Sequence, residues 1–480
     1  MSVMKVEELL VARGWVQPAD IERATERRRT SGGLITDSLL ALSLITPEQA
    51  DAVLQMTPPT LPTSAEDTGI PPRTLEALLL KGVHRGGVDT LPGLVELLRL
   101  PSAVVHSLLQ MAVEQQFLKV TGSHVRSTLP VLTYSLTATG RIAVAEAWER
   151  NRYVGPAPVS LQAYRERILR QRLRFDSAAP ERLRRVFADL VLTDEMIDRI
   201  GPAINAGRSI LLYGAPGNGK SSLARRIGRV FSDIIFVPYC FEVEGQIIQI
   251  FDPNVHVPVS RAEQDADRDL TIRHEDFDHR WVACRRPVVV TGGEFTLDML
   301  DLRYMDVSNF YEAPLHIKAM GGTFIIDDFG RQFVRPKDLL NRWMIPLEEK
   351  HDYLRLHTGT TFSLPFDELV IFCTNLAPDD LMDAAFLRRI PYKIKVGAPT
   401  MEQFRDILRR AAAERALALS QPMFDWLVDE LQIRRHQQLA CFQPRFIVDR
   451  IVEAGAFHNR PAEITEALVT AALDNLYTSA

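Results

Sequence analysis

The segment RSILLYGAPGNGKSS, residues 208–222, constrains the fold more than any other part of this sequence. An apolar, β-forming run leads into Gly214-x4-Gly219-Lys220-Ser221, and a helical pattern continues through LARRIGRVF. Glycines at 214, 217 and 219 let backbone N–H groups turn inward around a phosphate, where Cβ atoms would obstruct them. The strand, the spacing, the Lys-Ser pair and the helix together predict a phosphate-binding loop rather than a chance glycine-rich turn.

Nucleotide binding is assigned to the whole loop. Lys220 is expected to reach the β- and γ-phosphates of ATP, and the Ser221 hydroxyl to ligate Mg²⁺. The dipole of the following helix adds positive potential at the same place. The residues predicted to bind the nucleotide are Gly214, Ala215, Pro216, Gly217, Asn218, Gly219, Lys220, Ser221 and Ser222.

A second apolar strand, in GGTFIIDDFG at 321–330, ends in the two acids Asp327 and Asp328. A buried parallel strand delivers its carboxyl end to a nucleotide site. We therefore expect Asp327 to hold the Mg²⁺ shell, and Asp328 to orient and polarise the attacking water. A purely structural use of these acids is the alternative, which the preceding phosphate-binding loop disfavours.

A third strand, ELVIFCTNL, ends in Thr374 and Asn375, and the segment after it contains DAAFLRRIPYKIKV. With these motifs, residues 203 to about 477 resemble AAA+ ATPases, and closely a group of bacterial predicted ATPases with chaperone-like activity. The resemblance implies sensor 1 at Asn375, arginine fingers at Arg388 and Arg389, and sensor 2 at Arg445. For the finger pair, the alternative is a cationic helix end that favours its own dipole, and for Arg445 a surface arginine beside a capping proline.

The same resemblance implies an architecture and an assembly. It implies an α/β P-loop AAA+ core with a five-stranded parallel sheet at 201–398 and an all-α lid at 399–480, where four amphipathic helical patterns occur. It also implies ATP and Mg²⁺ as cofactors and a ring, usually a hexamer, in which the arginine fingers complete the neighbouring site. Most relatives carry Glu where this chain has Asp328, which is one methylene shorter, so hydrolysis is slower or the loop sits closer.

Residues 1–57 are predicted to form a small helical docking domain with a weak internal repeat, in which Leu10 and Val16 recur as Leu39 and Ile45. The second half resembles the amino-terminal domain of type II secretion and type IV pilus ATPases, some of which bind cyclic-di-GMP through an Arg-Leu-Gly type motif. Ser31 and Gly32 stand in place of Arg and Leu. Without the phosphate-binding arginine, protein docking is the expected role.

The region between this domain and the core divides into three parts. Residues 58–72, rich in proline, are predicted to be an extended linker that leaves residues 1–57 mechanically separate. Residues 73–156 resemble a winged helix, with three helices before two strands. The helix that would enter DNA has no Arg or Lys, so a protein-facing surface is favoured over DNA. Residues 157–200 are predicted to be an Arg-rich helical linker.

Two segments leave alternatives open. Residues 164–187 hold eight arginines against three acids, which suits a phosphate backbone, another subunit or a solvated helix. Residues 238–320 are longer than the expected connection between core strands, and their apolar runs predict added strands or a hairpin. Within them Ile247, Ile248 and Phe251 are candidate substrate grips facing a ring pore, although core packing is the commoner use of such residues.

Composition limits the classes of function. The chain has 480 residues, 46% hydrophobic and 24% charged, with a net charge of −5, which predicts a globular protein without a global basic field. No signal peptide or membrane span is expected, and four distant cysteines predict neither a zinc site nor a disulfide framework, so we expect a cytoplasmic protein without membrane insertion.

The functional prediction is an ATP-hydrolysing AAA+ ring that remodels or moves a macromolecule, with an unidentified protein partner chosen by residues 1–156. A nucleotide-gated scaffold or switch with little turnover is the first alternative, motivated by Asp328. A DNA-associated motor or regulator is the second, motivated by the winged-helix pattern and the arginine-rich segment.

Overall fold

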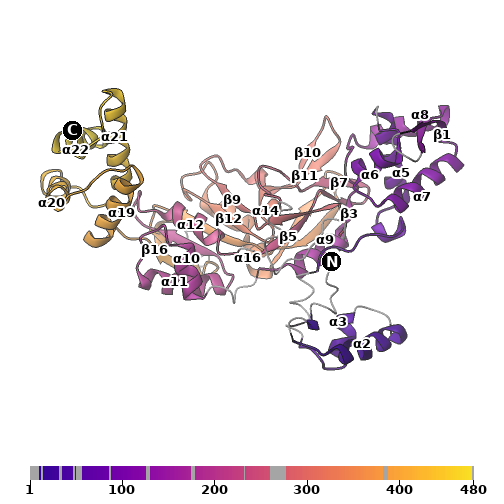
Figure 1. Cartoon of the computed structure of the whole chain (residues 1–480), viewed down its shortest axis with the longest axis horizontal. Helices are drawn as coiled ribbons and strands as arrows, with labels where there is room; N and C mark the ends of the chain where they lie inside the picture. Colours follow the sequence, from indigo (N-terminus) through magenta and orange to yellow (C-terminus); the bar gives the residue numbers. More distant parts are fainter. Residues whose placement is uncertain are drawn as a thin grey trace.

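A sheet of five parallel strands in the order β16-β4-β15-β12-β9 forms the core of the computed structural model (Figure 1). Parallel strands are covered on both faces, and β12 and β15 accordingly consist of buried residues throughout. This arrangement confirms the α/β core with a five-stranded parallel sheet. The strands are β4 (Ile210–Tyr213), β9 (Val288–Thr291), β12 (Thr323–Ile326), β15 (Leu369–Thr374) and β16 (Tyr392–Lys395).

The structure describes residues 10–11, 14–31, 35–46, 49, 57–85, 88–125, 130–173, 179–231, 233–259, 277–381 and 387–477. Of the residues that replace the Arg-Leu-Gly motif, Gly32 lies outside the described residues. Among those described, no helix combines the length and the apolar character that crossing a bilayer requires.

Helices cover both faces of the core sheet. One face packs against the hydrophobic side chains of α10, α11 and α12, and the other against those of α14, α15 and α16. The first of these clusters joins Leu183 and Ile197 to strand residue Ile210. The hydrophobic core therefore includes residues that precede residue 201 in the sequence. The helices are α10 (Pro180–Val186), α11 (Asp194–Asn205), α12 (Lys220–Gly228), α14 (Leu315–Lys318), α15 (Pro336–Arg342), α16 (Met344–Glu349) and α17 (Pro378–Leu381), with a 3-10 turn at Leu297–Leu300.

The long connection supplies four of the five strands of a second sheet, in the order β10-β11-β7-β6-β3, and β3 comes from much earlier in the chain. The expectation of added strands is therefore met, with one correction: the run VVVT is β9, an edge strand of the core sheet, and not part of the addition. The second sheet comprises β3 (Val159–Ser160), β6 (Cys240–Val243), β7 (Gln246–Gln249), β10 (Arg303–Met305) and β11 (Phe310–Glu312). Two further pairs are β5 (Ile234–Pro238) with β8 (Trp281–Arg285) and β13 (His351–Arg355) with β14 (Thr361–Pro365).

The interpretation of three apolar residues as pore-facing grips is wrong for this fold. Ile247 and Ile248 lie in β7 and are 1% and 0% exposed. Phe251 is half-buried, with its ring against Tyr239 and His256. These side chains pack inside the second sheet and its neighbours, which is the commoner use of such residues.

The proline-rich segment 58–72 is docked rather than free. The carbonyl of Thr57 accepts a hydrogen bond from Arg167 (2.8 Å), and that of Thr68 accepts one from Arg280 (3.0 Å). Both arginines are buried, so these bonds fix the segment against the body of the protein. The expectation of a mechanically separating linker at these residues is corrected accordingly.

The arginine-rich segment is used mainly for contacts within the chain. Arg165 donates to the carbonyl of Ser363 (2.8 Å), and Arg182 to that of Val230 (2.7 Å). Arg167 is buried between the rings of Phe236 and Trp281. Guanidinium groups held in this way are not free to follow a phosphate backbone. The helix in this segment is α9 (Leu161–Arg170), followed by α10.

Three helices, two antiparallel strands and a fourth helix follow residue 72. They are α5 (Pro72–His84), α6 (Leu91–Leu98), α7 (Ser102–Glu114), β1 (Leu118–Val125), β2 (Pro130–Leu136) and α8 (Ala138–Arg150), after a 3-10 turn at Glu66–Thr68. Before them, α2 (Pro18–Ser31) and α3 (Ile35–Ala41) form a small separate cluster, in which the repeated residues Leu10, Val16, Leu39 and Ile45 are all buried.

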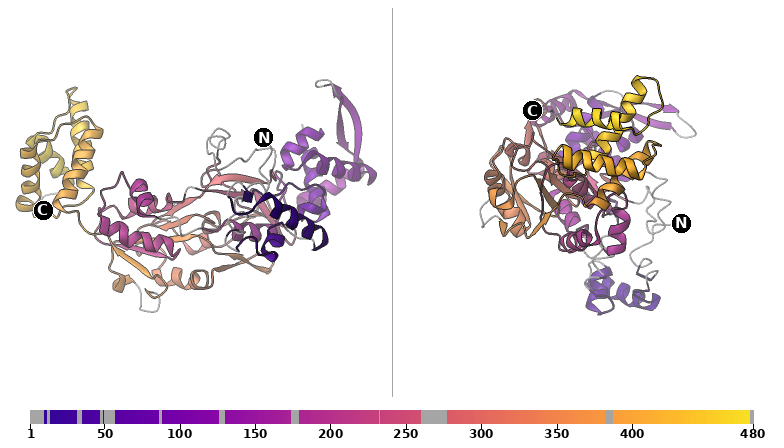
Figure 2. Two further views of the ribbon diagram at one scale, coloured as in Figure 1. Left: turned by 60° about the horizontal axis from the view of Figure 1, so that its bottom comes forward. Right: turned by 90° about the vertical axis from the view of Figure 1, so that its left-hand side faces the viewer.

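The lid is all-helical, at the positions of the four amphipathic patterns. Thr400 begins it with a capping box, accepting from the Gln403 N–H while the Gln403 side chain accepts from the Thr400 N–H. The lid lies at one end of the elongated molecule and the α5–α8 domain at the other (Figures 1 and 2). Its elements are α19 (Met401–Glu414), α20 (Gln421–Asp429), a π-turn (Glu430–Arg434), α21 (Gln443–Phe457) and α22 (Glu466–Leu476).

Candidate nucleotide-binding site

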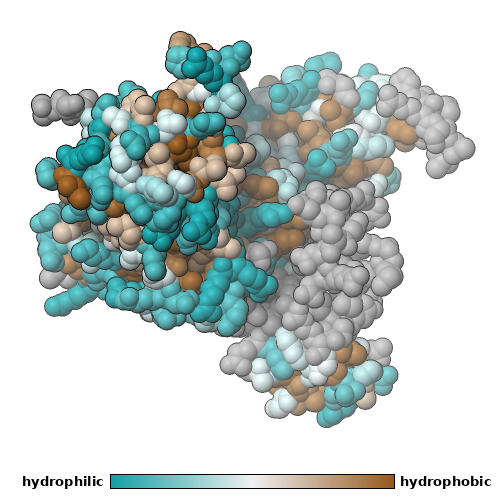
Figure 3. Space-filling view, turned by 60° about the vertical axis from the view of Figure 1, so that its left-hand side comes forward, coloured by the Kyte–Doolittle hydropathy of each residue, from teal (hydrophilic) through white to brown (hydrophobic). Residues whose placement is uncertain are grey.

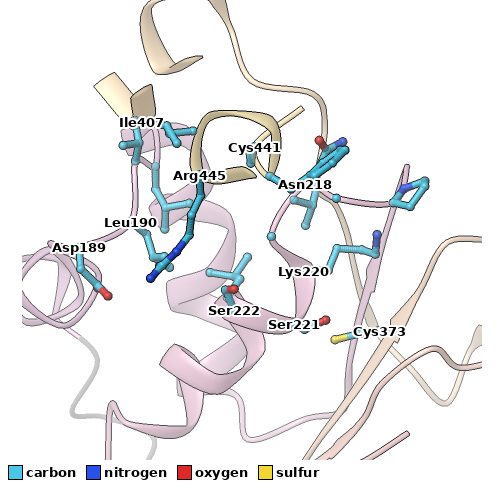
Figure 4. Close-up of a pocket in the computed structure, with 18 of the residues that line it drawn as sticks. Asp189, Leu190, Asn218, Lys220, Ser221, Ser222, Cys373, Ile407, Cys441 and Arg445 are labelled. Carbon is cyan, nitrogen blue, oxygen red and sulfur yellow. The ribbon is translucent and has the colours of Figure 1, made fainter. Parts of the chain in front are cut away.

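A cavity of about 700 Å³ lies between the core and the lid, at the carboxyl ends of β4, β12 and β15 (Figure 4). Its wall contains the phosphate-binding loop from Pro216 to Ser222, the acids Asp327 and Asp328, and Asn375. The lid closes it with residues from α19 and α21. Three motifs thus meet at one site, although the first lies more than a hundred residues before the other two in the sequence.

Two glycines of the loop are required by close approach. A Cβ atom at Gly214 would lie 2.3 Å from the carbonyl oxygen of Val396, and one at Gly217 would lie 2.3 Å from a ring carbon of Phe442. Both residues also have positive φ, +143° and +77°. The loop therefore fits tightly between β16 and the lid.

Lys220 is held across the mouth of the loop. Its Nζ donates to the carbonyls of Gly214 (2.9 Å) and Ala215 (2.8 Å) and to Oδ1 of Asn375 (2.6 Å). The side chain is buried, and this burial lowers the pKa of its ammonium group, while Cys373 and the two acids oppose the change. A charged group in a buried position with only neutral acceptors is suited to receive an anion.

Ser221 and Asp327 meet as the metal-site prediction requires. The Ser221 hydroxyl donates to Oδ1 of Asp327 (2.9 Å), beside the cavity. A hydroxyl and a carboxylate are hard oxygen donors, and Mg²⁺ is commonly bound through one or two protein groups together with phosphate and water. The donor set of these two residues therefore fits Mg²⁺.

Asp328 is presented by an unusual backbone. Its φ is +50°, and its N–H donates to Oδ1 of Asp327 (3.1 Å). The Asn375 amide lies 3.5 Å from Oδ1 of Asp328 while its oxygen accepts from Lys220. Asn375 thus connects the lysine of the loop to the second acid. Left-handed backbone at an aspartate is uncommon, and its cost is tolerated most often at functional sites.

Arg445 reaches the cavity from the first turn of α21. It lines the cavity, its side chain is 71% exposed, and its Nε lies 3.8 Å from Asp449. Figure 4 shows its guanidinium pointing into the space near Leu190 and Ser222. Three residues earlier, the Phe442 N–H donates to the Gly217 carbonyl (3.0 Å), so the lid is bonded directly to the phosphate-binding loop.

The predicted finger residues do not line this cavity. Arg388 is exposed, and Arg389 is half-buried with its Nε 2.6 Å from a carboxylate oxygen of Glu348. The structure therefore does not bring the arginine pair to its own chain's nucleotide cavity. Residues 382–386, just before them, lie outside the described residues.

Sequence reasoning missed one wall of the cavity. Leu190, Val191 and Leu192, between α10 and α11, face Ile407 and Ala411 of the lid across it. The sequence assigns these residues to the Arg-rich helical linker at 157–200, because they belong to no recognised motif. The feature of the sequence that could have identified this wall is a run of three apolar residues in a polar, arginine-rich region. These two apolar walls are suited to bind the flat base of a nucleotide between them.

From the sequence, Thr374 is recognised only as the last residue of a strand, but the structure gives it a further role. It is 1% exposed, and its hydroxyl donates to the Phe329 carbonyl (2.7 Å) and accepts from the Leu376 N–H (3.2 Å). It thereby ties the turn that carries Asp327 and Asp328 to the strand that carries Asn375.

Comparisons with known proteins agree with parts of this description. A domain of unknown function (DUF8689) matches residues 400–475, which is the lid. The vesicular-fusion protein sec18 of Schizosaccharomyces pombe is 26% identical over 198 residues, 38% of this chain and 24% of that protein, so the chain spans about a quarter of its length.

Among solved structures, NtrX from Brucella abortus in complex with ADP is similar with 15% identity and a TM-score of 0.38, over 72% of this chain and 68% of that one. The Thermotoga maritima RuvB Holliday junction branch migration motor is similar with 14% identity and a TM-score of 0.33, over 60% of this chain and 70% of that one.

Proposed function

We propose that this protein is an AAA+ ATPase, which binds and hydrolyses ATP at the subunit interfaces of a ring and so remodels or moves a macromolecular partner. The observation that carries the proposal is the meeting of Lys220, Ser221, Asp327, Asp328 and Asn375 at one cavity, which the lid closes with Arg445. The similarity to a vesicular-fusion protein supports a macromolecular partner.

Each residue has a role that follows from its position. Lys220 supplies positive charge to the terminal phosphates, and Ser221 with Asp327 would hold Mg²⁺. Bound there, the metal would neutralise phosphate charge and favour displacement at the terminal phosphorus. Asp328 and Asn375 orient the attacking water, and Arg445 adds charge from the lid.

The position of the arginine pair outside its own chain's cavity supports the proposal of a ring. Arg388 is exposed and lies outside its own chain's cavity, as a finger serving a neighbour must. Hydrophobic groups are also exposed on the lid end of the molecule (Figure 3), where Ile433 is 65% and Phe457 is 85% exposed. Such side chains suit burial against a second subunit. We propose a hexamer as the closed assembly.

The test compares Lys220→Ala with Asp328→Asn. Removing the lysine should weaken ATP binding by at least about 100-fold, because charge-assisted contacts to phosphate are lost. Removing the carboxylate should change affinity by less than about threefold and lower turnover by about 100-fold. Fluorescent-nucleotide titration and steady-state phosphate release measure the two quantities.

Asp306→Asn is the control, since Asp306 is exposed on the β10–β11 turn and away from the cavity. It should leave both quantities unchanged. Equal loss of affinity in the Lys220 and Asp328 variants would contradict the assigned roles.

A nucleotide-gated switch with little turnover is the second candidate. It is favoured by the short side chain at Asp328, whose carboxylate meets Asn375 only at 3.5 Å. A steady-state rate indistinguishable from that of Asp328→Asn, with tight nucleotide binding, would establish the switch and contradict the motor.

Partner choice is assigned to residues 1–156. We propose a protein partner for the winged-helix-like domain, because Arg and Lys are absent from α7 and phosphate contacts dominate DNA affinity. Salt-sensitive DNA binding by the full chain would instead favour a DNA-associated motor.

A further inference from the structure

A second cavity, of about 80 Å³, is lined by residues of α5 and α8, helices that lie at the end of the molecule opposite the lid (Figure 2). Helices α5 and α8 form one side of it, and the turn between β6 and β7 forms the other. Arg73, Lys81 and Arg150 all line it, and no carboxylate of the described residues does. A wider outer cavity of about 380 Å³ adjoins it and shares Arg73 and Arg150.

Lys81 is the unusual member of this group. It is 1% exposed, and its Nζ donates to the Asn151 carbonyl (2.8 Å) and to Asn151 Oδ1 (2.7 Å). An ammonium group has three donors, and Nζ also lies 5.5 Å from the centre of the Trp148 ring, so the third hydrogen has no hydrogen-bond acceptor among these contacts but faces a cation–π partner nearby. Burial, with Arg150 nearby, lowers the pKa of Lys81 to about 8. The C-terminal dipole of α8 offsets only part of the cost of burying this charge.

The other buried lysines show what such a charge normally has beside it. Lys81, Lys220 and Lys318 are the lysines classed as buried in the described part of the chain. Lys318 pairs with the carboxylates of Asp252 and Glu312. Lys220 faces the proposed phosphate site. Lys81 has no carboxylate within ion-pair distance among the described residues. In this respect it resembles Lys220 rather than Lys318.

The two arginines are also without carboxylate partners. Arg73 is exposed and forms no ion pair in the part of the chain that the structure describes. Arg150 is also exposed; it donates to the backbone carbonyl of Glu146 (3.4 Å) and forms no ion pair with the residues that the structure describes. By contrast, the buried Arg280 and Arg286 each pair with an aspartate. Positive charge therefore converges on the small cavity, and the acids that offset part of it line the adjoining outer cavity.

We propose that this cavity binds a phosphate dianion, either inorganic phosphate or the phosphate group of a small monoester. Three cations line the small cavity, whereas the two acids beside the arginines, Glu76 and Glu146, line the adjoining outer cavity, so positive charge is in excess at the small one. A bound anion touches α5, α8 and the β6–β7 turn together. It therefore braces the α5–α8 domain against the second sheet.

The experiment uses the full-length chain carrying Lys220→Ala, which removes the phosphate-binding loop as a competing site. Calorimetric titration with inorganic phosphate should show one site per chain with a Kd below about 1 mM. Adding Lys81→Met should weaken this binding by about tenfold or more, and Arg150→Gln should weaken it severalfold. Glycerol phosphate and acetate are parallel titrants: equal binding of the monoester identifies a phosphate group of either source, and equal binding of acetate overturns the phosphate assignment.

Glu76→Gln separates this proposal from a structural role. Removing the nearby negative charge should tighten phosphate binding by about threefold, which a merely structural Lys81 does not predict. Arg141→Gln, on the exposed face of α8 and away from the cavity, is the matched control and should bind as the parent does.

If Lys81→Met fails to fold, Arg150→Gln and Glu76→Gln still test whether the cavity binds phosphate. The proposal is overturned if phosphate does not bind the parent at millimolar concentration, or if neither variant changes its affinity. Because every arm carries Lys220→Ala, these outcomes are independent of whether the chain hydrolyses ATP.

Discussion

The contact between the lid and the phosphate-binding loop leads to a quantitative prediction for Gly217→Ala. The new Cβ would lie 2.3 Å from Cδ1 and 2.9 Å from Cε1 of Phe442, at a residue with φ of +77°. Left-handed backbone costs an alanine about 1 kcal/mol, and overpacking costs a further ~1–3 kcal/mol. The Phe442 ring is 40% exposed, so it escapes the clash by moving outward, and the lid opens with it.

An open lid withdraws Arg445 from the nucleotide. We therefore expect Gly217→Ala to weaken binding of a fluorescent ATP analogue by the overpacking energy, which corresponds to roughly 5- to 150-fold. Phe442→Ala removes the clash, so in that background Gly217→Ala should retain only the backbone strain. The double-mutant cycle should give a coupling of about 1–3 kcal/mol.

Glu453→Ala serves as the control, because Glu453 lies on α21, is exposed and does not line the nucleotide cavity. Its cycle with Gly217→Ala should be additive within about 0.5 kcal/mol. Additivity in the Phe442 cycle as well would show that the lid does not contact the loop in solution, and the reasoning would fail.

Two further predictions concern assembly and pH. Arg388→Ala or Arg389→Ala should lower the rate of ATP hydrolysis at least about tenfold and leave ATP affinity unchanged. Mixing either variant with Lys220→Ala subunits should restore some activity through hybrid interfaces. A monomeric protein whose arginine variants keep undiminished activity would contradict this prediction. Glu368 is buried, and no hydrogen bond to its carboxylate oxygens is found in the described structure, so burial raises its pKa well above the ordinary value. Its contribution to stability is full below the unfolded pKa and is lost as pH rises toward the folded pKa, so Glu368→Gln should resist urea better than the parent at pH 8 and differ less at pH 5.

The local motifs predicted which residues meet at the cavity, because their spacing fixes their geometry. A strand, a glycine-rich turn and a helix place Lys220 and Ser221 without help from distant residues. Asp327 and Asn375 follow from the rule that parallel strands present their carboxyl ends at one edge. The same rule says nothing of the backbone at Asp328 or of the hydrogen bond from Thr374 that holds its turn.

The errors came from partners far away in the sequence. IIFVP and VVVT are equally good strands, and only packing decides that VVVT joins the core sheet. Prolines in 58–72 indicated an open linker, since proline cannot donate in a ladder. The carbonyls there are nevertheless good acceptors, and Arg167 and Arg280 supply donors from much later in the chain.

The second sheet has a consequence for cooperativity. Strand β3 pairs with β6, and Cys240 and Ile247 of β6 and β7 belong to the same hydrophobic cluster as α5, α6 and α7. The α5–α8 domain therefore cannot open without exposing Ile247 to water. Its amides and those of β6 and β7 should exchange with deuterium as one unit. A recombination event that replaces this domain must carry the β6–β7 hairpin with it, so the exchangeable module is discontinuous in the sequence.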